Sequence, residues 1–471
     1  MKTLLGVLVG FAVVACGDDS TCEQASNCQN TGGGLVAGAG GESSGGNAAG
    51  AGEPGGASSN GGEGAGGSAP TATTIYVESD NGAWIKDLEV IVNAPDGELL
   101  FEELTDINGA VTVMVPPGGS VSLLREYDMT WLDPIQKQRS VETVFFDDSP
   151  SGTIRFMIRQ PIAPYEPPNG VMNLTVSYPT KAGAADYLVK TSCGQQSTSS
   201  TQVTLTVASC TPNGLFDILV VARNAAGDIV DHAHAESLVF AAGTVNSPLT
   251  WATLPLTAID FSLSNVPAEA LQITANTIAK QEQGGRTITA LTQRFVADPM
   301  SEYAASLAHL TSYGSEHCQQ ATVDLVSDAN ALAYISKLRC TQTADVSDFA
   351  LDASRLERFD VLPPSPDGQV MHWETSSAGE AGDLLTIRQY WTRNGDIGTW
   401  TAFKAPGAGE AVFPALPPPF ADFGIGAKDS LVQSSVIHED DVELEGFEQA
   451  LAAGVPFGGL GDVEGYTSHA Y

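Results

Sequence analysis

The stretch Met172-Asn173-Leu174-Thr175-Val176-Ser177-Tyr178 decides the fold class, because apolar and polar side chains alternate along it without a break. A period of two is typical of a half-buried β-strand. Residues 203–207 repeat the alternation. Two further apolar runs, 215–222 and 229–235, flank the turn signal at 224–228 and predict a hairpin. Short strands about every ten residues, with no alternating helices, predict a β-sandwich.

The residues before this stretch predict a first β module. Strand-like runs occupy 74–78 and 88–92, and a turn signal, Pro95-Asp96-Gly97, follows. The run from Thr105 to Val115 then leads into Pro116-Pro117-Gly118 and another apolar run.

These pieces together resemble the carboxypeptidase regulatory-like domain, a small transthyretin-like β-sandwich. The match rests on the opening strand, the Pro-Asp-Gly turn, the Thr-Asp-x-x-Gly stretch at Thr105 and the Pro-Pro-Gly. It departs at Val111, Val113 and Val121, where the family usually has aromatic residues. The resemblance implies a spacer or binding module without catalytic residues. Asp106 and Asn108 suit either a turn or a calcium ion, and the turn is the preferred interpretation.

The Pro-rich segment 161–170 predicts a boundary, beyond which we expect a disulfide-bearing β-rich domain at 166–345. Helical spacing from Asp298 to Leu310, and again over 329–338, predicts one or two short helices. A C-terminal β-rich domain at 346–471 contains a hairpin signal, Asn394-Gly395. Its tryptophans suit core packing better than sugar stacking. The predicted fold is therefore mainly β, with two to three sandwich domains of immunoglobulin-like or transthyretin-like type.

The N-terminal residues have the layout of an export signal. Lys2 precedes an apolar run from Leu4 that ends at Val13-Val14-Ala15-Cys16. This ending resembles the lipobox of bacterial lipoproteins, which implies removal of residues 1–15 and acylation of Cys16, with palmitate among the lipids. An ordinary cleaved signal is the alternative. Residues 16–72 are rich in Gly and Ser and predict a disordered tether, about 35 Å between its ends. The first module is then expected at 73–160.

Six cysteines remain if Cys16 carries lipid, and an even number in an exported chain fits disulfides. Pairing between sequence neighbours is the simplest arrangement. Cys193 and Cys210 would lie too far apart in a simple hairpin, so either the second segment crosses to the opposite sheet or the two are not partners. The candidates are Cys22, Cys28, Cys193, Cys210, Cys318 and Cys340.

The charge of the chain limits its partners. Acidic residues outnumber basic ones 56 to 21, a formal charge of −35. Such a surface repels nucleic acid and anionic lipid headgroups and favours cationic partners and divalent ions. The acidic run 439–445 is expected to be a solvated surface.

The best chemical candidate is His232-Ala233-His234-Ala235-Glu236. In a strand, His232, His234 and Glu236 share one face and could bind a transition metal if a further ligand is supplied. A half-exposed polar strand face explains the same residues and is the preferred interpretation. The sequence has no HExxH, P-loop or Gly-x-Ser-x-Gly motif.

We therefore expect a non-enzymatic lipoprotein of the outer membrane, held by its lipid anchor and displaying binding or structural modules at the cell surface. Its expected partners are the membrane and a protein or glycan ligand, with no cofactor and no nucleic acid. The alternative is an envelope metal-dependent hydrolase that uses His232, His234 and Glu236. A scaffold that faces the periplasm is a third possibility.

Overall fold

The computed structural model describes residues 70–79, 83–129, 135–148, 150, 152–158, 171–191, 194–207, 215–241, 243–252, 257–283, 286–297, 300–310, 313–326, 332–342, 348–365, 367–426, 429–441, 443–455 and 461–470. Several predictions fall outside these ranges. They concern the signal, the tether and five cysteines, namely Cys16, Cys22, Cys28, Cys193 and Cys210.

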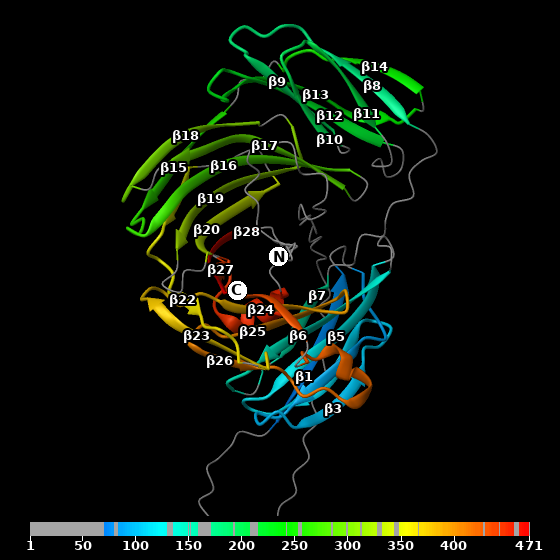
Figure 1. Ribbon diagram of the computed structural model, residues 1–471, viewed down its shortest axis with the longest axis vertical. Coiled ribbons are helices and arrows are strands. Elements are labelled where there is room, and N and C mark those ends of the chain that lie inside the picture. The colour runs from blue at the N-terminus through cyan, green and yellow to red at the C-terminus, as the bar shows by residue number, and fades with distance from the viewer. Residues whose placement is uncertain are drawn as a thin grey trace, which may run out of the picture. The chain divides into compact units, whose positions relative to one another are not determined.

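The N-terminal module is a sandwich of two facing sheets (Figure 1). One sheet has the order β4-β1-β7, and the other runs β3-β2-β5-β6. Alternate residues of β1 and β2, such as Ile75 and Val90, point between the sheets and form one buried core. The strands are β1 (Thr71–Ser79), β2 (Glu89–Asn93), β3 (Leu99–Leu104), β4 (Ala110–Val115), β5 (Ser120–Met129), β6 (Gln136–Phe145) and β7 (Thr153–Ile158).

Asp106 forms a turn in this module. Its Oδ1 accepts hydrogen bonds from the backbone N–H groups of Asn108 at 2.8 Å and Ala110 at 2.9 Å. These bonds close the connection between β3 and β4 and lower the pKa of Asp106. The preferred interpretation of this residue is confirmed.

The stretch at Met172 lies in a second sandwich, with sheets β10-β9-β12-β13 and β11-β8-β14. The alternation of β8 buries Leu174 and Val176 against Ile218 and Val220 of β12. β9 and β11 belong to opposite sheets. The chain therefore crosses to the opposite sheet between β9 and β11, which is the first of the two alternatives given above for Cys193 and Cys210. The strands are β8 (Met172–Ser177), β9 (Asp186–Thr191), β10 (Gly194–Thr198), β11 (Gln202–Val207), β12 (Leu215–Arg223), β13 (Ile229–Val239) and β14 (Gly243–Pro248).

The next strands correct the helix prediction. Residues 303–309 form β18, which pairs with β15, and residues 332–341 form β20, which pairs with β19 and β28. Leu307 of β18 is buried against Ile259 and Phe261 of β15, so sheet pairing outweighs the local helix propensity. The strands here are β15 (Thr257–Ser264), β16 (Ala270–Gln283), β17 (Arg286–Ala297), β18 (Tyr303–His309), β19 (Glu316–Val326), β20 (Leu332–Thr341) and β21 (Phe349–Asp352).

The C-terminal residues complete the fold. Asn394 and Gly395 both have positive φ and join β24 to β25 in the predicted two-residue hairpin. The tryptophans of this part, Trp373, Trp391 and Trp400, are buried in one core, as expected. The elements are β22 (Arg358–Val361), β23 (Val370–Ser377), β24 (Leu384–Arg393), β25 (Asp396–Lys404), β26 (Gly409–Val412), a 3-10 helix η2 (Pro418–Phe423), β27 (Ser430–Asp441), α1 (Phe447–Ala453) and β28 (Gly461–Ala470).

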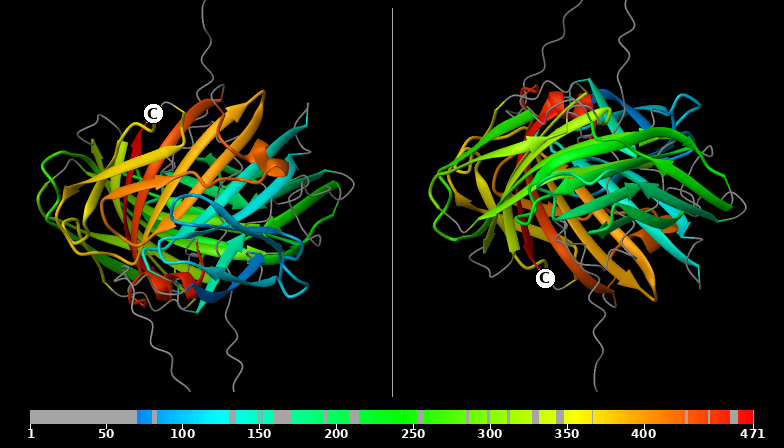
Figure 2. Two further views of the ribbon diagram at one scale, coloured as in Figure 1. Left: turned by 90° about the horizontal axis from the view of Figure 1, so that it is seen from below. Right: turned by 90° about the horizontal axis from the view of Figure 1, so that it is seen from above.

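One sheet of twelve strands runs through all three predicted β units. Its order is β17-β16-β19-β20-β28-β27-β24-β25-β6-β5-β2-β3. β25 pairs in parallel with β6 of the N-terminal module, and Figure 2 shows these two strands beside each other. The chain is therefore mainly β, as predicted. The boundaries near 160 and 345 stay predictions, and hydrogen-bonded strand pairs connect the segments on either side of them.

No helix within the described ranges is both long and apolar enough to cross a membrane.

Candidate functional site

The predicted histidine face lies on β13, and its residues do share one side of the strand. Ala233 faces the core of the second sandwich, whereas His232 and His234 point the other way. The two imidazole rings stack with centroids 5.8 Å apart and planes 7° apart. Nε2 of His234 lies 3.6 Å from Oε1 of Glu236. The period-two spacing thus placed these three side chains correctly relative to one another.

Burial controls the protonation of this face. His232 is fully buried, and this lowers its pKa to about 4, helped by His234 and opposed by Asp231. The imidazole is therefore neutral at pH 7, the form that binds metals. In the described part of the chain, one group of three potential ligands has all its ligand atoms within 4.8 Å of one another: Glu316, Cys318 and Cys340. The metal site on β13 stays a prediction.

The structure adds residues to this face that the sequence did not indicate. Tyr313, from the connection between β18 and β19, lies with its ring 5.5 Å from that of His234. Its buried hydroxyl forms no hydrogen bond with the described residues. Nearby, Nε2 of His309 lies 3.0 Å from Nδ1 of His317. Tyr313 is 74 residues or more from β13 in the sequence, and no local pattern connects them.

Cys318 and Cys340 form a disulfide, in agreement with one of the neighbour pairings. They lie directly opposite each other on β19 and β20, with Cα atoms 4.1 Å apart. The bond therefore joins two adjacent strands. Because both sulfurs are bonded to each other, neither is available as a thiolate ligand beside Glu316.

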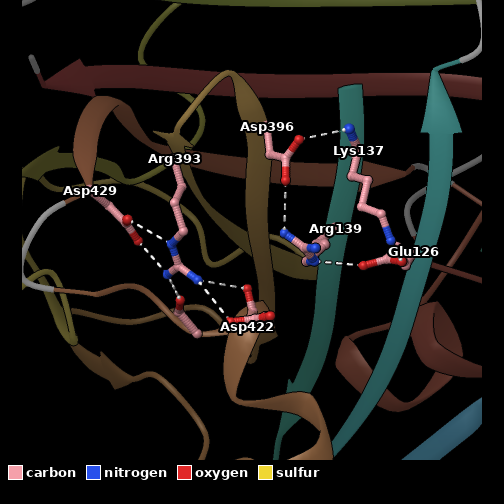
Figure 3. Close-up of polar contacts among 8 residues, drawn as sticks. Glu126, Lys137, Arg139, Arg393, Asp396, Asp422 and Asp429 are labelled. Carbon is pink, nitrogen blue, oxygen red and sulfur yellow. Dashed lines mark hydrogen bonds and ion pairs between the residues drawn. The ribbon is translucent and has the colours of Figure 1, made fainter. Parts of the chain in front are cut away.

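A network of charged side chains connects the N-terminal module to the C-terminal segment (Figure 3). Arg139 of β6 donates from Nε to Glu126 of β5 at 2.6 Å and from Nη1 to Asp396 of β25 at 3.2 Å. Lys137 donates from Nζ to Glu126 at 2.6 Å, and its backbone N–H donates to Asp396 at 3.0 Å. Asp396 therefore bonds two residues of β6, next to the parallel pairing of β6 with β25.

Arg393, at the end of β24, anchors the loop that contains η2. It donates to both carboxylate oxygens of Asp429, at 2.8 and 2.6 Å, and to the backbone oxygens of Asp422 and Gly424. The hydrogen bonds from Arg393 outweigh burial and lower the pKa of Asp429. Such two-pronged Arg–carboxylate pairs fix geometry well.

Between these two groups lies a small hollow of about 10 Å³. This is about the space that a single water molecule needs, far too little for an organic ligand. Its basic residues, Arg139 and Arg393, are both paired with acids. We conclude that the network fixes strands and a loop in place. The lining residues are Arg139, Trp391, Arg393, Asp396, Ile397, Gly398 and Asp422.

Two glutamates of the twelve-stranded sheet are also withdrawn from water. Burial raises the pKa of Glu142 on β6 and of Glu439 on β27, and Arg388 on β24 opposes the rise at both. Arg125 also pairs with Glu142 at 3.4 Å. Glu439 belongs to the acidic run expected to be solvated, and the structure places it half-buried on β27, an interior strand of the sheet.

No family model matches the sequence, and no curated protein matches it. Among solved structures, the Bacillus anthracis TIE protein aligns at 10% identity over 60% of this chain and half of its own, with a TM-score of 0.13. The major pilin subunit BcpA of Bacillus cereus aligns at 10% identity over 60% of this chain and 97% of its own, with a TM-score of 0.14. The pilus adhesin SpaC of Lactobacillus rhamnosus GG aligns at 10% identity over 71% of this chain and 44% of its own, with a TM-score of 0.12. TM-scores this low carry no argument about this chain.

Proposed function

We propose that this chain is a non-enzymatic lipoprotein of the outer membrane, whose β-rich body is displayed at the cell surface on a Gly-rich tether. The observation that carries the anchor and the tether is the lipobox-like ending Val13-Val14-Ala15-Cys16, followed by the Gly- and Ser-rich residues 16–72. The parallel pairing of β6 with β25 inside the twelve-stranded sheet fastens the first folded module to the C-terminal segment. A tethered β-rich body held together in this way suits the binding of a protein or glycan, or a structural role in the envelope.

The anchor is tested by acylation. We expect cells expressing the full chain to incorporate labelled palmitate into it, and the protein to stay in the membrane fraction after a wash in high salt. Cys16→Ser is expected to abolish both the label and the membrane retention, because Cys16 is the predicted lipid attachment site. Cys22→Ser is the matched control, since it changes a neighbouring cysteine outside the lipobox. Full labelling of Cys16→Ser would refute the anchor.

The rival function is a metal-dependent hydrolase. The neutral, buried imidazole of His232 and the proximity of His234 to Glu236 favour it. Purified protein dialysed against zinc would then hold one zinc ion per chain and lose it in His234→Ala. His372→Ala is the control, because His372 is exposed elsewhere in the fold, with its Nδ1 3.2 Å from Oε2 of Glu410. Failure to retain zinc would remove the rival.

A further inference from the structure

The outer edge of β3 combines unpaired backbone with exposed apolar side chains. β3 is the last strand of the twelve-stranded sheet, and in the described residues its only partner is β2. All six of its residues are exposed, with Leu99, Leu100, Phe101 and Leu104 between 37% and 53% exposed. An exposed apolar edge strand is a template on which another strand can pair.

Exposed apolar side chains are concentrated here. Of the 14 large hydrophobic residues exposed in the described chain, six fall between residues 99 and 114. The other two, besides the four on β3, are Ile107 in the next turn and Met114 on β4, itself the end strand of its sheet. By contrast, the edge strand β10 has the sequence Gly-Gln-Gln-Ser-Thr. A patch of this kind on a soluble surface marks an interaction site.

The same edge carries negative charge without a counter-charge. Glu102 and Glu103 lie on β3, Glu98 lies just before it, and Glu89 lies on β2. None of the four forms an ion pair with a basic side chain in the part of the chain that the structure describes. Burial raises the pKa of Glu89, and the charges of Glu102 and Glu103 raise it further. A cationic side chain at this edge would relieve the repulsion.

We propose that the β3 edge binds an extended segment of another protein in which apolar residues flank a basic pair. Such a segment would add a strand to the sheet, with its apolar side chains beside Leu99–Phe101 and Leu104 and its basic pair beside Glu102 and Glu103. A second copy of this chain fits less well. Self-pairing would bring glutamates together between two chains that each carry a formal charge of −35.

The test uses the purified full chain and a fluorescent peptide whose core reads Val-Lys-Lys-Val-Val-Val, the antiparallel complement of β3. Binding is measured by fluorescence anisotropy. The control peptide has the same sequence, with methyl groups on alternate backbone nitrogens that block strand pairing. We expect the control to bind at least about tenfold more weakly, a loss of about 1.4 kcal/mol.

A set of protein variants distinguishes binding at this edge from non-specific binding to exposed apolar residues. Phe101→Lys is expected to weaken binding at least about tenfold. Its control is Leu271→Lys. Leu271 is 54% exposed, slightly more than Phe101 at 42%, but lies on β16, a strand with partners on both sides, so this variant should bind like the native chain. The double change Glu102→Lys and Glu103→Lys should reverse the preference to a peptide with Glu-Glu in place of Lys-Lys. Circular dichroism confirms that each variant is folded.

Equal binding of the methylated peptide, or unchanged binding by Phe101→Lys, would overturn the proposal. A dimer in sedimentation that Phe101→Lys dissociates would overturn the choice of partner and replace it with a second copy. This inference deepens the proposed function by naming the kind of partner. Peptide binding to the purified chain does not require acylation of Cys16, so failure of acylation and failure of peptide binding are separate results.

Discussion

Trp400 of β25 gives the most direct test of the contact between β25 and β6 of the N-terminal module. Its side chain is fully buried, and its Nε1 donates a hydrogen bond of 3.2 Å to Oγ1 of Thr143 on β6. Its ring packs edge-on against Phe413, 5.1 Å between centroids. Trp400→Ala removes this packing and leaves a cavity, which costs about 3–5 kcal/mol. The free energy of unfolding in urea should fall by about that amount.

The control is Trp84→Ala, because Trp84 is 47% exposed. Trp84→Ala should lower the free energy of unfolding by about 1 kcal/mol or less. Far-UV circular dichroism follows both transitions. If Trp400→Ala lowered the unfolding free energy by less than about 1 kcal/mol, the residue would not be in a packed core and the reasoning would be refuted.

The link between β25 and β6 can be isolated with a double-mutant cycle. Trp400→Phe keeps an aromatic ring but removes the donor, and Thr143→Val removes the acceptor. The coupling energy between the two changes should be about 1 kcal/mol, the net value of one hydrogen bond. A coupling energy near zero would show that the two side chains do not interact.

Three more outcomes follow from other contacts. Replacing Cys318 and Cys340 by Ala should lower the unfolding free energy by about 3 kcal/mol, since the loop they close in the unfolded chain spans 22 residues; equal midpoints with and without reductant would contradict this. Gly398→Ala should destabilise by about 1–3 kcal/mol, because a Cβ there would overlap the indole of Trp391, and a native midpoint would refute it. Stability should also fall as the pH drops from 6.5 towards 4, because His232 becomes protonated in the unfolded chain but stays neutral in the folded chain, where its pKa is about 4. The free energy of unfolding should fall by about 3 kcal/mol in total once the pH is below 4. A His232→Gln variant with the same pH dependence as the native chain would rule this out.

Local patterns in the sequence predicted the local structure well. The alternation at 172–178 became β8, and Asn394-Gly395 became the expected hairpin turn. The helix prediction for residues 303–309 was wrong because the helix-favouring spacing of Ala and Leu is only a weak preference. The open edge of β15 offered a full ladder of hydrogen bonds to the same residues.

The sequence patterns could not predict which strands pair when they lie far apart in the chain. β6 and β25 are more than 240 residues apart, and nothing in either strand specifies the other as its partner. For the same reason, the sequence patterns did not predict the contacts of Arg139 with Asp396 and of His234 with Tyr313. The histidine face itself was predictable, because it needs only the period of two within one strand.

Protease shaving of intact cells tests the central claim most directly. A protease that cuts in the Gly-rich tether should release one fragment that begins near residue 70, while periplasmic markers stay inside the cells. The fragment should contain both β6 and β25 on one polypeptide, seen as a single band in a denaturing gel. Complete protection until the outer membrane is opened would contradict surface display. Release of separate N-terminal and C-terminal pieces would contradict the single fastened body.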